Sequence, residues 1–185
     1  MSLRHGLLVI WIGLAVPGCA APAAPPAPVA APPDDLSQLL PEGASAPDVA
    51  ALDRSGKSRS LTQFRGKPVV LYFYPMDFAA GASAEADEFG ADFAKYRRLG
   101  ANIVGVSTDQ PQVHRDFAEK FKLPYPLLSD PNGDLARAFG VPLQAGTIRH
   151  ATFLIDRRGV IRKVWPKVRP WGHSREVLEA LKQLP

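Results

Sequence analysis

The sequence is almost free of cysteine: among 185 residues the only one is Cys19, close to the N-terminus. A single thiol cannot form an internal disulfide, and no Cys-x-x-Cys pair is present for thiol–disulfide exchange. The cysteine pair that a copper chaperone would need is absent as well. We therefore expect neither two-thiol redox chemistry nor a metal, and no residue pattern indicates another cofactor.

Strong charge and a long apolar run are also missing. The formal net charge is +4 and the basic residues are scattered, so binding to nucleic acid is not expected. The apolar run at residues 6–16 is shorter than the ~20 residues that span a bilayer. Because Arg4 and His5 precede this run and small residues follow it, residues 1–18 predict an export signal.

The residues that end this signal read VPGC, at positions 16–19. This resembles the lipobox of bacterial lipoproteins, in which the signal is cut before a cysteine that then carries lipid. Cys19 is therefore the predicted lipidation site and a membrane the predicted partner; the alternative is an ordinary signal peptide with Cys19 incidental. Ala20 and Ala21 lack the acidic residue that favours inner-membrane retention, so we expect an exported protein on the outer membrane, facing the periplasm.

Residues 19–35 form a separate segment rich in alanine and proline. Its six prolines disfavour a helix and favour the extended polyproline II conformation. We interpret this segment as a stalk or neutral spacer between the lipidated Cys19 and a single folded domain at residues 36–185.

Patterns of strands and helices alternate through the folded domain. The apolar run 69–74 predicts a buried strand, and residues 83–99 carry apolar side chains at helical spacing. Asp109 is expected to cap a helix that has Pro111 in its first turn. The other expected strands are 101–107, 127–128, 151–156 and 160–168, and the other helices 133–139 and 173–184. This order predicts an α/β fold, a central mixed sheet with helices on both faces.

Residues 72–87 read YFYPMDFAAGASAEAD. This segment resembles the active-site loop of Q-type, or bacterioferritin-comigratory, peroxiredoxins, whose frame is YFYPxDxTPGCTxE. Similar blocks follow the family order at residues 46–48, 61–70, 104–109, 126–131, 138–141, 152–156 and 172–173. The resemblance covers roughly residues 40–184. It implies a thioredoxin-like fold and the thiol-dependent reduction of hydroperoxides.

The chain departs from the family pattern where the chemistry occurs. Ala82 stands at the position of the peroxide-attacking cysteine, and Asp87 at that of the resolving cysteine. Ala79 and Ala80 replace the family's threonine and proline, whereas Gly81 and Glu85 keep the pattern. The family mechanism needs a thiolate that passes through a sulfenic acid, which an alanine methyl cannot supply.

The family's arginine lies two residues before the threonine of the block 152–156. That position is His150 here, and Arg149 precedes it. Arg149 could still reach the site if the register slips by one residue. His150 could bind a metal or transfer protons, but no second ligand at suitable spacing accompanies it, so a lone, partly buried histidine is favoured. The implied site positions, called the vestigial site below, are Ala79, Ala80, Gly81, Ala82, Glu85, Asp87, Arg149 and His150.

Two functions remain open from the sequence. The favoured one is a catalytically inactive binding or scaffold module, with a protein partner or a small anionic ligand at the helix N-terminus that follows Gly81. The alternative is the family's thioredoxin-dependent peroxidase activity, which would have to use Cys19. Trp165 and Trp171 near the C-terminus either pack against the last helix or form an aromatic patch for a partner.

Overall fold

A computed structural model describes residues 36–184. The predicted export signal (1–18), Cys19 and the predicted stalk (19–35) lie outside the described residues. Within the described part, no helix is long and apolar enough to cross a membrane.

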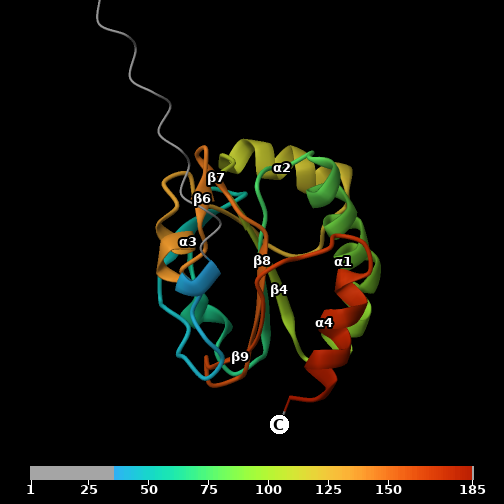
Figure 1. The fold of residues 1–185 in the computed structure, drawn as a ribbon. Coiled ribbons are helices and arrows are strands. Elements are labelled where there is room, and N and C mark those ends of the chain that lie inside the picture. Colours follow the sequence, from blue (N-terminus) through green and yellow to red (C-terminus); the bar gives the residue numbers. More distant parts are fainter. Residues whose placement is uncertain (1–35, 185) are drawn as a thin grey trace, which may run out of the picture. The chain divides into compact units, whose positions relative to one another are not determined.

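A seven-stranded mixed sheet forms the centre of the domain (Figure 1). Its strand order is β2 (Ser58–Ser60), β1 (Ala50–Asp53), β5 (Leu127–Ser129), β4 (Asn102–Ser107), β3 (Val69–Phe73), β8 (Ala151–Ile155) and β9 (Ile161–Trp165). β3 pairs in parallel with β4 and antiparallel with β8. All five residues of β3 are buried, as expected for an apolar run in a sheet covered on both faces. The predicted mixed sheet is confirmed.

Helices cover both faces of this sheet (Figure 1). One face packs against α1 (Ala80–Arg98), α2 (Pro111–Lys120) and α4 (His173–Lys182). The other packs against α3 (Asp134–Ala138), the 3-10 helix Leu61–Phe64, and Leu39 and Leu40, which follow a second 3-10 helix at Leu36–Gln38. The sheet thereby separates two apolar layers, which is the arrangement of a thioredoxin-like domain.

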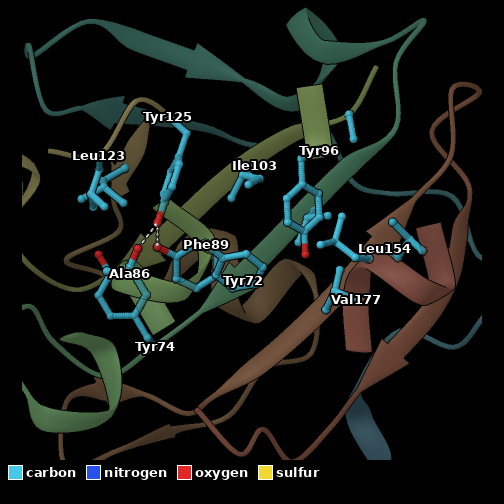
Figure 2. Packing of buried hydrophobic residues seen from close by; sticks show 14 of the residues in the cluster. Tyr72, Tyr74, Ala86, Phe89, Tyr96, Ile103, Leu123, Tyr125, Leu154 and Val177 are labelled. Atoms are coloured by element: carbon cyan, nitrogen blue, oxygen red, sulfur yellow. Dashed lines mark hydrogen bonds between the residues drawn. The ribbon is translucent and has the colours of Figure 1, made fainter. Parts of the chain in front are cut away.

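The layer beneath α1 is rich in tyrosine (Figure 2). The Tyr72 ring stacks on Phe89 of α1 at 5.0 Å between centroids. Its hydroxyl lies 3.3 Å from the hydroxyl of Tyr125, which donates to the backbone oxygen of Ala86 at 3.4 Å. Burial raises the pKa of Tyr72 well above its usual value, so this cluster stays uncharged and fixes α1 to β3.

Two strand pairs, β1 with β2 and β6 with β7, have no counterpart in the sequence prediction. β6 (Leu143–Gln144) and β7 (Thr147–Ile148) form a hairpin of two-residue strands beside the main sheet. Ala145 and Gly146 make its turn, with φ values of 49° and 81°. Positive φ at both central positions is typical of the tight turns that suit hairpins. The strands are too short to give an alternating pattern in the sequence.

The structure corrects the expected starts of two helices. α1 begins at Ala80, three residues before the predicted start. The cap of α2 is Gln110, and its side chain makes no capping hydrogen bond. Asp109 does not cap α2, because its carboxylate accepts hydrogen bonds from Asp77 N and Ser107 Oγ, both at 2.7 Å. The carboxylate of Asp109 thus accepts a hydrogen bond from the loop before α1 instead of from the first turn of α2.

Candidate functional site

The vestigial site lies where β3 passes into α1. Phe78 has a φ of 61°, which is rare for a residue other than glycine. The cap residue Ala79 makes no side-chain hydrogen bond, and the first turn of α1 contains no acidic residue. No side chain at the cap therefore pairs with the first backbone N–H groups of α1. These groups form the positive end of the helix dipole.

Ala82 occupies the third position of α1 and is 1% exposed. Its methyl group packs in the tyrosine-rich layer with Tyr74 and Ala86. A methyl group has no lone pair with which to attack a peroxide and no proton to exchange. Asp87 is exposed, so it has no place in the buried centre around Ala82.

The buried polar group of the site is Glu85, whose side chain is fully buried. His150 Nδ1 lies 3.0 Å from Glu85 Oε2, but its direction falls outside that of a hydrogen bond. Neither carboxylate oxygen of Glu85 has a hydrogen-bond partner among the described residues. Burial raises the pKa of Glu85, and the neighbouring His150 opposes this rise. His150 is partly buried, and its contact with the Glu85 carboxylate was not predicted.

Gly81 leaves room for the ring of His150 at the helix N-terminus. A Cβ on Gly81 would lie 3.5 Å from His150 Nε2 and 3.2 Å from Pro170 Cγ. His150, a quarter of whose side chain is exposed, thus lies beside the start of α1. The structure brings Gly81, Ala82, Glu85 and His150 together.

Arg149 does not join this group through a register slip. Its Nη1 donates to Gln144 Oε1 at 2.5 Å, and its backbone N–H donates to Pro142 O at 3.0 Å. The guanidinium thus contacts the β6–β7 hairpin, while His150 contacts Glu85. Both residues line a cavity of about 320 Å³ between this hairpin and residues 166–168.

A second carboxylate–imidazole pair beside the site was not predicted. His114 Nδ1 lies 2.8 Å from Asp77 Oδ2, and both side chains are fully buried. The Tyr74 hydroxyl donates to Asp77 Oδ1 at 2.7 Å, and His114 Nε2 lies 3.1 Å from Leu128 O. This network fixes the loop that leads into α1. The spacing of His114 from Phe117, three residues along a helix, was the signal that could have placed it on the buried face.

The two C-terminal tryptophans have different surroundings. Trp165 is 6% exposed and donates from Nε1 to Glu176 Oε1 at 2.8 Å, so packing against α4 is confirmed for it. Trp171 is 71% exposed. A metal site is not formed by the described residues, which contain no group of three or more suitable side chains.

The sheet and the site at the start of α1 are those of a protein with a thioredoxin-like fold. Sequence comparison identifies the family within this class. Residues 43–164 match the model of the AhpC/TSA family. The chain is 37% identical over 146 residues to chloroplastic peroxiredoxin Q from Populus jackii, covering 77% of this chain and 68% of that protein. The same identity and length relate it to chloroplastic peroxiredoxin Q from Sedum lineare, of which it covers 78%.

Solved structures agree with this assignment. Peroxidoxin BcpB from Mycobacterium tuberculosis matches with a TM-score of 0.73 and 31% identity, over 78% of this chain and 97% of that one. A cysteine-to-serine mutant of PrxQ from Xylella fastidiosa matches with a TM-score of 0.73 and 29% identity, over 77% and 96%. The chain belongs to the AhpC/TSA family, and within it to the peroxiredoxins of the Q, or bacterioferritin-comigratory, type.

Proposed function

We propose that this protein is a catalytically inactive member of its family that serves as a binding module. The observation that carries the proposal is the buried methyl group of Ala82 at the start of α1. Peroxide reduction by a thiol transfers one peroxide oxygen to sulfur and releases the other in an alcohol or water. The sulfenic acid is then reduced by a second thiol. No residue in 36–184 is a cysteine, so the folded domain lacks the sulfur atom that each of these two steps requires.

Ser83 does not replace the missing thiol. Its hydroxyl follows Ala82 in α1, but a serine oxygen does not cycle through a sulfenic acid and a disulfide. What the site keeps is a helix N-terminus, the Glu85–His150 contact and a neighbouring cavity. These features can bind a ligand without a chemical reaction. We expect a protein partner or a small anionic ligand, because the N-terminus of a helix attracts anions.

The proposal includes export and anchoring. Cleavage before Cys19 and acylation of that residue would hold the domain at a membrane through the segment 19–35. More than one acyl chain gives firm attachment, and the outer membrane facing the periplasm is the proposed address. Mass spectrometry of the N-terminal peptide tests this: the proposal predicts an acylated Cys19, and an unmodified peptide that begins elsewhere contradicts it.

The alternative is the family activity itself, as in the Xanthomonas campestris relative whose structure is described in terms of alkyl peroxide reduction. Family membership favours this alternative. It requires an unlipidated Cys19 to serve as the only thiol, from a stretch of chain in which no helix N-terminus is predicted to lower its pKa.

A peroxide assay separates the two. The full chain is incubated with hydrogen peroxide and a dithiol, and peroxide is followed over time. If the protein is an inactive binding module, peroxide should disappear no faster than in buffer with dithiol alone. This should hold for the native chain and for Cys19→Ser alike. Turnover that Cys19→Ser abolishes would establish the alternative.

A further inference from the structure

We propose that the cavity beside His150 binds a small organic carboxylate with an apolar body. This rests on the proposed binding function and names the ligand class. The cavity has a volume of about 320 Å³ and lies between the β6–β7 hairpin and the segment 166–168. That volume is at the lower end of the range for small-molecule sites.

The charged groups that line this cavity are all of one kind. Arg149, His150 and Lys167 contribute side chains, and no aspartate or glutamate of residues 36–184 lines it. Within residues 36–184, Lys167 is exposed and no ion pair is formed by it. An anion would thus meet cationic groups from two separate segments, β7 with its following residues and the chain after β9.

Among the described residues, the carboxylate that faces His150 is held away from the cavity. Glu85 is fully buried behind His150, with its Oε2 3.0 Å from His150 Nδ1. Its negative charge is therefore directed at the imidazole ring. A guanidinium has five N–H groups, so the hydrogen bond from Arg149 to Gln144 is compatible with a further acceptor.

The remaining lining distinguishes an organic anion from an inorganic one. Pro75, Pro166 and Val168 give apolar walls, and Gln144 and Thr147 give uncharged polar groups. A phosphate or sulfate would use the cations but leave these walls without contact. A carboxylate on a short hydrocarbon chain uses both, because burial of each methylene adds favourable free energy.

Titration of the ¹⁵N-labelled full chain with hexanoate tests the proposal. The amide resonances of Gln144, Thr147, Arg149, His150 and Lys167 should shift together and saturate, with a Kd of about 1 mM. Shortening the acid to butyrate should weaken binding, by up to about fourfold for each methylene removed, the value for a fully buried methylene. 1-Hexanol, which lacks the charge, and inorganic phosphate, which lacks the apolar body, should bind more weakly than hexanoate.

A matched pair of variants locates the site. Lys167→Gln should weaken hexanoate about threefold, as expected for an exposed charge pair. Lys57→Gln makes the same change of charge between β1 and β2, at the opposite edge of the sheet, and should leave the Kd unchanged.

Three outcomes would overturn the proposal: shifts that do not saturate, phosphate binding at least as tightly as hexanoate, or equal effects of Lys167→Gln and Lys57→Gln. Each is independent of the peroxide assay. If hexanoate does not bind, the proposal of an inactive module still stands. If the protein consumes peroxide, the hexanoate titration is still valid.

Discussion

Two carboxylate–imidazole pairs lie near the start of α1, and they differ in nearly every physical respect. Asp77 and His114 are fully buried and hydrogen-bonded at 2.8 Å, with Tyr74 and Leu128 providing their remaining contacts. Glu85 and the quarter-exposed His150 are 3.0 Å apart without a hydrogen bond.

This difference separates the scaffold from the site. The first pair holds the loop that leads into α1, and every one of its polar atoms has a partner. The second retains an incompletely paired arrangement of the sort found where proteins bind or react rather than where they are merely held together. Removing one partner of a buried, hydrogen-bonded pair is costly, because the other partner is left buried without its hydrogen bond.

The largest expected effect comes from breaking the satisfied pair. His114→Ala should lower the free energy of unfolding by about 3–5 kcal/mol, because it leaves the Asp77 carboxylate buried without its partner. His150→Ala, the matched change in the other pair, should lower it by less, because it removes a contact at 3.0 Å but no hydrogen bond. Urea unfolding at pH 7 measures both. Equal losses would contradict the distinction between the pairs.

A third histidine extends the comparison to pH. His173 Nε2 lies 2.9 Å from Thr152 Oγ1, and burial lowers the pKa of His173 from 6.5 to about 4. Between these values the unfolded chain binds the proton more readily, so stability is full above pH 6.5 and falls as the pH drops to 4. The loss should reach roughly 3 kcal/mol.

Unfolding curves of the native chain and His173→Gln between about pH 7 and pH 4 measure this contribution. The variant should lose less stability over the interval than the native chain does. Parallel pH profiles of the two proteins would show that His173 makes no such contribution.

The smallest expected effect concerns the unsatisfied pair. Burial raises the pKa of Glu85, so its charged form opposes folding above its ordinary pKa near 4.5. Glu85→Gln should therefore stabilise the protein by about 1 kcal/mol at neutral pH, and this gain should vanish as the pH falls to about 4.5. The exposed Glu119→Gln is the control and should change stability by less than about 0.5 kcal/mol. A destabilised Glu85→Gln would show that His150 satisfies the carboxylate after all.

Much of the fold could be predicted because long apolar patterns carry it. The run 69–74 marked the central strand, and the hairpin of β8 and β9 followed from its two strand patterns and the turn at Gly159. Short elements escaped: β1, β2, β6 and β7 have two to four residues each, too few for a periodic pattern.

The site was predicted in its residues but not in its contacts. The motif placed Ala82, Glu85 and His150 in one region, because the family frame fixes their positions along the chain. It could not show that His150 faces Glu85, since the two are far apart along the chain and meet only through the pairing of β3 with β8. Asp109 was assigned to a helix cap for the same reason: local spacing does not reveal that Asp77, from another loop, competes for its carboxylate.

The central claim is that the reactive position holds no nucleophile, and restoring one tests it most directly. The measurement is the rate of hydrogen peroxide loss with dithiol for the native chain and for Ala82→Cys. The account predicts no rate above buffer and dithiol for the native chain, and a measurable rate for Ala82→Cys, whose thiol would lie at the N-terminus of α1. A native chain that consumes peroxide as fast as the variant would contradict it.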